Sequence, residues 1–164
     1  MKTRRRDGSL AVFPGSFDPI TNGHLDVIHR ARRLFARVVV AVLVNPGKSP
    51  MLTLDERLAV IRDSLVGRAG IDVVAFDGLL VEAATAHDAT VVVRGLRSVT
   101  DFEHEWPMAR MNAALLPDLE TVYVSASPQW AHVSSSLVRQ IHALGGSIDA
   151  FVPPAVLAHL GRRK

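Results

Sequence analysis

The chain of 164 residues contains no cysteine. This absence excludes a disulfide framework, a thiolate metal site and a cysteine nucleophile, and it is compatible with a reducing compartment. Long apolar runs are also missing: the longest, VVVAVLV at 38–44, is far shorter than the roughly 20 residues that a membrane-spanning helix needs. The basic first residues are not followed by the apolar stretch of a secretory signal. We therefore expect a cytoplasmic protein with no membrane partner.

Positive charge is scarce in the body of the chain, although the formal net charge is +3. Residues 1–8 and residues 162–164 each carry a net charge of +3, which leaves residues 9–161 mildly acidic. Proteins that bind nucleic acid concentrate basic residues on a folded face, so we expect no nucleic-acid partner. The length suits one hydrophobic core. The sequence predicts a disordered basic tail over 1–8, one domain over 9–161 and a basic end over 162–164.

Short, valine-rich apolar runs alternate with segments of helical periodicity. Most of the runs are continuous rather than alternating, which is typical of strands buried on both faces of a parallel sheet; they cover 9–13, 37–44, 71–76, 89–94 and 119–125. Apolar residues at helical spacing fill 27–35 and 54–65, and Thr53 and Glu56 have the spacing of a capping box. This order predicts a single-domain α/β fold, a doubly wound, Rossmann-like five-stranded parallel sheet with helices on both faces.

Three more helices are expected in the second half of the chain. Residues 100–116 should form one in which Pro107 either produces a kink or lies in the first turn. Ser134–Ser136 should cap another, which ends at Gly145. The last segment, FVPPAVLAHLG at 151–161, predicts a short final helix.

Polar residues gather directly after the predicted strands, in the segments PGSFDPITNGH, NPGKSP, RGLR and SPQWAHVSSS. In open parallel sheets, ligands bind beyond the carboxyl ends of the strands, where helix N-termini offer free amides. Cations and hydroxyls at this edge are typical of a phosphate site; here they are Ser16, His24, Lys48, Arg94, Arg97 and Ser134–Ser136. Each of these residues, taken by itself, could have a purely structural role; His24, for example, could be a helix cap. Their coincidence at one edge favours a site for a polyanion.

The two arginines also have acidic neighbours in the sequence. Arg94 and Arg97 could pair with Asp101, Glu103 or Glu105, so ion pairs and a ligand role are both open for them. The common phosphate-binding and esterase signatures are absent: the sequence has no G-x-x-x-x-G-K-[ST], no G-x-G-x-x-G and no G-x-S-x-G. A phosphate ligand must therefore be held in another way.

The motifs TNGH (21–24), RGLRSVTDFEHE (94–105) and SSSLVR (134–139) resemble, in this order, those of the nucleotidyltransferase superfamily. Over about residues 10–160 the chain is most similar to the bacterial phosphopantetheine adenylyltransferase family. This resemblance implies reversible transfer of the adenylyl group of ATP to 4'-phosphopantetheine, which gives dephospho-coenzyme A and pyrophosphate in coenzyme A biosynthesis. It implies direct in-line attack without a covalent intermediate. It also implies Mg²⁺ bound through the ATP phosphates rather than by protein side chains, and a homohexamer.

The resemblance further assigns roles to individual residues. The implied catalytic residues are His24, Lys48 and Arg97. The implied phosphopantetheine contacts are Ser16, Lys48, Leu80, Arg94, Met108 and Asn112. The implied ATP contacts are Ser16, Phe17, His24, Gly95, Leu96, Arg97, Glu105, Trp130, Ala131, His132, Val133, Ser134, Ser135 and Ser136.

Some positions depart from the family pattern. Ser49 stands where a second lysine is common, His104 where a tyrosine is common, and Trp106 and Pro107 where ordinary helix formers are common. These changes bear on the pantetheine pocket and on assembly more than on the reaction. Two alternatives stay open: a related transferase with another phosphorylated acceptor, such as nicotinamide mononucleotide or glycerol phosphate, and a nucleotide-binding regulator without activity.

Overall fold

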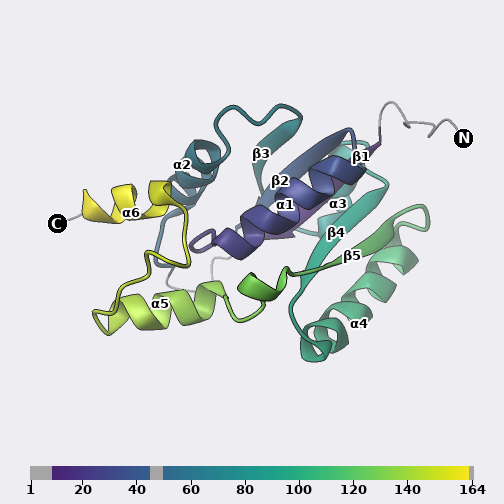
Figure 1. Cartoon of the computed structure of the whole chain (residues 1–164). Coiled ribbons are helices and arrows are strands. Elements are labelled where there is room, and N and C mark those ends of the chain that lie inside the picture. The colour runs from purple at the N-terminus through teal and green to yellow at the C-terminus, as the bar shows by residue number, and fades with distance from the viewer. Residues whose placement is uncertain (1–8, 45–49, 163–164) are drawn as a thin grey trace, which may run out of the picture.

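A five-stranded, wholly parallel sheet forms the centre of the molecule, which a computed structural model describes over residues 9–44 and 50–162 (Figure 1). The strand order is β3-β2-β1-β4-β5, and the sequence order reverses at β1. The predicted parallel α/β sheet is therefore confirmed. Its strands are β1 (Leu10–Gly15), β2 (Arg37–Leu43), β3 (Ile71–Phe76), β4 (Val91–Leu96) and β5 (Glu120–Ser125).

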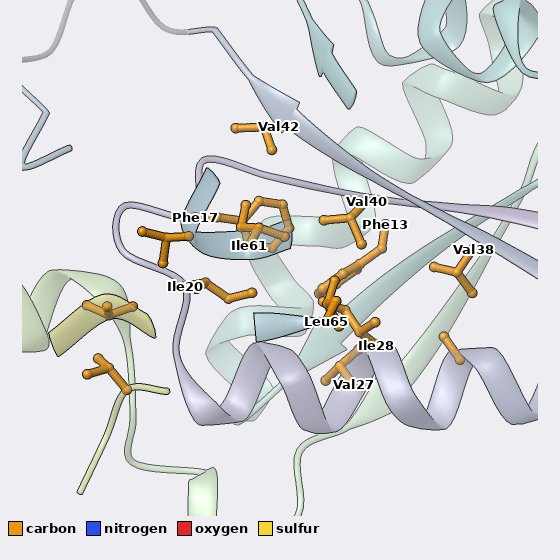
Figure 2. Close-up of a cluster of buried hydrophobic side chains, with 14 of the residues drawn as sticks. Phe13, Phe17, Ile20, Val27, Ile28, Val38, Val40, Val42, Ile61 and Leu65 are labelled. Atoms are coloured by element: carbon orange, nitrogen blue, oxygen red, sulfur yellow. The ribbon is translucent and has the colours of Figure 1, made fainter. Parts of the chain in front are cut away.

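Helices cover both faces of the sheet, as expected. Successive strand residues point to opposite faces, so Phe13 and Val40 enter one apolar cluster while Val12 and Val39 enter another. The first cluster, shown in part in Figure 2, is completed by α1 (Asn22–Leu34), α2 (Leu54–Ser64), α5 (Ser135–Ala143) and α6 (Pro154–Gly161). The second is completed by α3 (Leu80–Ala86) and the residues that follow α4 (Val99–Leu115).

Several element ends differ from the sequence prediction. Helix α4 continues through Pro107, which lies in its interior and not in its first turn. Helix α3 was not predicted at all, because its seven residues are too few to show a clear periodicity. Strand β4 extends to Leu96, two residues beyond the predicted end at Arg94, so Gly95 and Leu96 belong to the strand and not to the loop after it. The capping box at Thr53 is confirmed.

Strands β1 and β4 separate early, and this separation creates space for a site. They pair only at Ala11 with Val91 and Val12 with Val92, whereas β1 stays paired with β2 as far as Gly15. Pro14 has no amide hydrogen and cannot extend the ladder; its carbonyl instead accepts a hydrogen bond from Arg94 Nη1 at 3.1 Å. The sheet therefore opens at the reversal of strand order, where ligands bind in such folds.

Some expectations fall on residues that the structure does not describe. These are the tail over 1–8, the end residues Arg163 and Lys164, and Lys48. Within 9–44 and 50–162, no helix is both long enough and apolar enough to cross a bilayer.

Candidate functional site

A cavity of about 320 Å³ occupies the opening between β1 and β4. Its lining comes from the carboxyl ends of these strands, from the first two turns of α1 and α4, from the first turn of α5, and from the short 3-10 helix η1 (Pro128–Trp130). Among the residues expected from the sequence to contact ligands, those that line it are Ser16, Phe17, His24, Arg94, Gly95, Arg97, Glu105, Trp130, Val133, Ser134, Ser135 and Ser136.

The remaining candidates lie elsewhere. Leu80 begins α3 and packs against the second apolar cluster. Met108 is exposed on α4, and Asn112 is buried on the same helix. His132 is exposed, with its ring 6.1 Å from that of Phe151. Leu96, Ala131, His132, Leu80, Met108 and Asn112 do not line the cavity, and Lys48 is outside the described residues.

His24 takes part in the cap of its own helix. Thr21 is the N-cap of α1, and its hydroxyl accepts a hydrogen bond from the His24 amide at 3.3 Å. The ring nitrogen Nδ1 of His24 accepts a hydrogen bond from the Thr21 amide at 3.1 Å and lies 3.0 Å from the Thr21 hydroxyl. A backbone amide can only donate, so Nδ1 carries no proton. The neutral ring must therefore hold its proton on Nε2.

The surroundings of His24 favour this neutral form. Burial, together with the positive charge of Arg97, lowers the pKa of His24 to about 4. The ring of Phe17 meets the imidazole edge-on, with 5.2 Å between the ring centroids. Phe17 lies in the turn after β1 and has a positive φ of 46°, which is unusual for a bulky residue. At neutral pH, His24 can offer an uncharged N–H group as a donor.

Both arginines of the RGLR motif are held by carboxylates. Arg94 Nε lies 2.9 Å from Glu105 Oε2. Arg97 donates from Nε and Nη2 to the two oxygens of Asp101, each at 2.9 Å. Although burial of Asp101 opposes the shift, hydrogen bonds from Arg97 lower the pKa of Asp101 below its usual value. The ion pairs left open by the sequence are thus formed, and they fix the two guanidinium groups at the cavity.

Two helix N-termini at the cavity carry no acidic residue. The first turns of α1 and α5 are free of Asp and Glu, whereas α2, on another part of the fold, has Asp55 and Glu56 there. Acidic side chains at this position would offset the positive end of the helix dipole. Ser134 caps α5 by accepting a hydrogen bond from the Leu137 amide at 3.2 Å. These helix ends are therefore suited to an anionic ligand.

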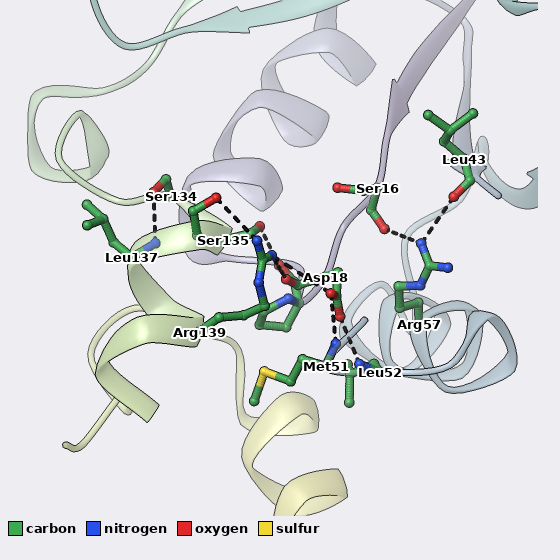
Figure 3. Close-up of polar contacts among 12 residues, drawn as sticks. Ser16, Asp18, Leu43, Met51, Leu52, Arg57, Ser134, Ser135, Leu137 and Arg139 are labelled. Atoms are coloured by element: carbon green, nitrogen blue, oxygen red, sulfur yellow. Dashed lines mark hydrogen bonds and ion pairs between the residues drawn. The ribbon is translucent and has the colours of Figure 1, made fainter. Parts of the chain in front are cut away.

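The turn after β1 is tied to α5 and to the start of α2 (Figure 3). The buried Asp18 carboxylate accepts hydrogen bonds from the amides of Met51 and Leu52 at 2.9 and 2.8 Å. Arg139 of α5 donates to the Asp18 carbonyl, and Ser135 donates to the Pro19 carbonyl at 2.8 Å. These bonds hold Ser16 and the serine cap of α5 in a fixed relation.

The chain is similar in sequence to known proteins. Residues 12–141 match the sequence model of the cytidylyltransferase-like family. The phosphopantetheine adenylyltransferase of Alkalilimnicola ehrlichii is 52% identical over 156 residues, which cover 94% of this chain and 90% of the relative. The chain belongs to the phosphopantetheine adenylyltransferase family. The protein of that name from Thioalkalivibrio sulfidiphilus is 51% identical over 154 residues, covering 94% and 97% of the two chains. That from Nitrosomonas eutropha is 46% identical over 153 residues, covering 93% of each.

The sequence reasoning missed the part played by Thr21. The signal was present, because a threonine three residues before a side chain that can accept a hydrogen bond follows the pattern of a capping box. Histidine is uncommon three residues after the N-cap, where a capping box usually has Glu or Gln. Asp101 was named only as a possible ion-pair partner, although it also lines the cavity.

The lowered pKa of His24 predicts a contribution to acid instability. Between pH 6.5 and about 4, the unfolded chain binds a proton at His24 that the folded chain does not. The free energy of unfolding therefore falls as the pH is lowered through this range. This effect lowers the free energy of unfolding by about 2 kcal/mol at pH 4.5, and a His24→Asn variant should lack this decrease. Urea titrations of both proteins at pH 4.5 and 7 would measure the difference. Nitrogen NMR should also show a proton on Nε2 at pH 7; a ring that titrates near pH 6.5 would contradict the assignment.

Proposed function

We propose that the chain transfers the adenylyl group of ATP to 4'-phosphopantetheine, giving dephospho-coenzyme A and pyrophosphate. The observation that carries this proposal is the convergence of His24, the RGLR arginines and two acid-free helix N-termini on one cavity. Membership of the phosphopantetheine adenylyltransferase family supports the identity of the acceptor.

The reaction needs alignment and charge stabilisation more than it needs a nucleophile from the protein. An oxygen of the acceptor phosphate attacks the α-phosphorus of ATP, and the bond from that phosphorus to the oxygen leading to the β-phosphate breaks. The attacking group is already an anion, so no covalent enzyme intermediate is required. The protein then contributes by holding two polyanions in line and by stabilising the charge that moves onto pyrophosphate.

His24 is the proposed donor to this moving charge. Its Nε2–H is uncharged and is fixed by the Thr21 cap before any ligand binds. A donor that is already oriented needs no rearrangement during the reaction. We assign Arg97 to the ATP phosphates together with His24, and Ser16, Phe17, Gly95, Glu105 and the residues from Trp130 to Ser136 to the remaining ATP contacts.

The acceptor is assigned to the other side of the site. Arg94 and Lys48 are proposed to bind the phosphate of phosphopantetheine, and Ser16 to contact both substrates. The resemblance to the family assigns Leu80, Met108 and Asn112 to the pantetheine arm; they lie on α3 and α4, outside the cavity.

Mg²⁺ is the proposed cofactor. Within the described residues, no three His, Asp or Glu side chains form a group that could hold a metal. The two acidic residues at the cavity nearest the arginines, Asp101 and Glu105, are engaged in ion pairs. These paired acidic residues fit a Mg²⁺ ion held by the phosphates of ATP, and the ion would neutralise part of the phosphate charge.

We also propose that the chain forms a homohexamer. Helix α4 presents exposed apolar side chains on two sides, which a lone protomer would leave in water. They are Val99, Phe102, Trp106, Met108, Met111 and Leu115. Val99, Phe102 and Trp106 lie on one side of α4, and Met108, Met111 and Leu115 lie on the other; both sets are suited to packing against other copies of the chain.

A pyrophosphate-release assay tests the reaction. Purified protein with ATP and Mg²⁺ should release pyrophosphate with 4'-phosphopantetheine, and not with nicotinamide mononucleotide or glycerol 3-phosphate. Mass spectrometry should identify dephospho-coenzyme A as the second product. Turnover with nicotinamide mononucleotide alone would assign the chain to a related transferase. ATP binding without turnover on any acceptor would favour an inactive nucleotide-binding protein.

The role of His24 is tested by His24→Ala. Loss of an oriented donor from a site of developing negative charge costs about a hundredfold in turnover, and we expect at least that decrease. His142→Ala is the matched control, because His142 is exposed on α5 and lies outside the cavity; its turnover should equal that of the wild type. Near-normal turnover of His24→Ala would reject the assigned role.

The assembly is tested by Met111→Glu, which places a charge among the exposed apolar side chains Met108, Met111 and Leu115 of α4. Light scattering after gel filtration should give a hexameric mass for the wild type and a smaller one for this variant, since burying an unpaired carboxylate is unfavourable. Leu144→Glu is the control, because Leu144 is exposed beyond the end of α5. A monomeric wild type at micromolar concentration would contradict the proposal.

A further inference from the structure

Arg57 of α2 lies behind the turn that carries Ser16, and it is only 6% exposed. Its Nη1 donates to the carbonyl of Ser16 at 2.7 Å and to that of Leu43 at 3.1 Å (Figure 3). The ladder between β1 and β2 includes the pair Gly15 and Val42, and each acceptor is the next residue along its chain. One nitrogen of Arg57 therefore joins the two strands at the edge where they leave the sheet.

The charge of Arg57 is not matched by a carboxylate from the part of the chain that the structure describes. Within the described residues, none of the ion pairs includes Arg57, and its Nε is buried without a hydrogen-bond acceptor. Arg94, Arg97 and Arg139 differ, because each lies near an acidic side chain. Removing an ion from water without a partner is unfavourable, so an isolated buried guanidinium needs a compensating interaction.

A polyanion in the cavity would supply that interaction. Ser16 lines the cavity on one side, and its carbonyl is held by Arg57 on the other. Arg57 does not itself line the cavity, so its effect on a ligand must act through space and not by direct contact. Buried charges are screened less than exposed ones, which lets such an effect extend over several ångströms.

We infer that Arg57 is a positioning residue that fixes the Ser16 turn and, through its unpaired buried charge, selects ligands that carry phosphate groups over neutral ones. The inference rests on the proposed function only in taking ATP as a ligand. It does not depend on which acceptor the protein uses.

The test compares the binding of ATP with that of adenosine, which shares the base and ribose but carries no charge. Dissociation constants from calorimetry on the full-length protein give the ratio of the two affinities for each variant. In Arg57→Gln, which keeps a donor but loses the charge, we expect ATP to bind about tenfold more weakly while adenosine changes less than twofold. Arg57→Lys keeps the charge, and its ratio should stay within about twofold of the wild type.

Arg62→Gln is the matched control. Arg62 also lies on α2 and donates to a backbone carbonyl, that of Val73 at 3.1 Å, but the bond is exposed. The ratio of ATP affinity to adenosine affinity in Arg62→Gln should equal that of the wild type. If Arg57→Gln weakens ATP and adenosine equally, Arg57 is only structural and the inference is wrong. If Arg57→Gln does not fold, Arg57→Lys still decides, because a reduced ratio despite the retained charge would overturn the inference. If the wild-type protein does not turn over 4'-phosphopantetheine, the proposed function is rejected, and this comparison of ATP with adenosine is unaffected.

Discussion

The early separation of β1 from β4 determines where chemistry can occur in this fold. Beyond Val12 the two strands no longer pair, and Pro14 has no amide hydrogen with which to extend the ladder. Arg94 of β4 donates to the Pro14 carbonyl and so reaches across the opening. Because the strand order reverses at β1, the helices after β1 and β5 begin beside the same gap. One break in a ladder therefore brings a cation and two helix N-termini together.

His24 combines a structural and a chemical property in one ring. The cap requires an unprotonated Nδ1, and this requirement leaves the proton on Nε2. A charged imidazolium would lose the acceptor that the Thr21 amide needs, and Arg97 together with burial opposes that charge. The helix start thus fixes the tautomer as well as the position of the ring. A donor prepared in this way stabilises charge that develops in a reaction without a cost of reorientation.

The sequence was most informative where one physical signal dominated. Short valine-rich runs predicted all five strands. Strands β1 and β2 are largely buried as that pattern implies, whereas the edge strands β3 and β5 are partly exposed. The sequence was less informative where glycine is required for packing and not for a turn. Gly95 suggested a loop, yet it belongs to β4. A β-carbon at this position would lie about 3.0 Å from the Val27 side chain of α1. Helix α3 is short and Leu79 offers no capping hydroxyl. The choice of acidic partners for Arg94 and Arg97 depended on the position of α4, which local spacing did not specify.

The charges around the cavity fall into two kinds, and the difference bears on how a polyanion is bound. Arg94 and Arg97 are each balanced by a carboxylate, so a phosphate must share or replace an existing ion pair when it reaches them. Such pairs orient the guanidinium groups but contribute little net positive potential. Arg57 and the acid-free ends of α1 and α5 have no such balance within the described residues. Under the proposed function, attraction to the anion would depend on groups that do not need to be displaced, while the paired arginines would determine its orientation.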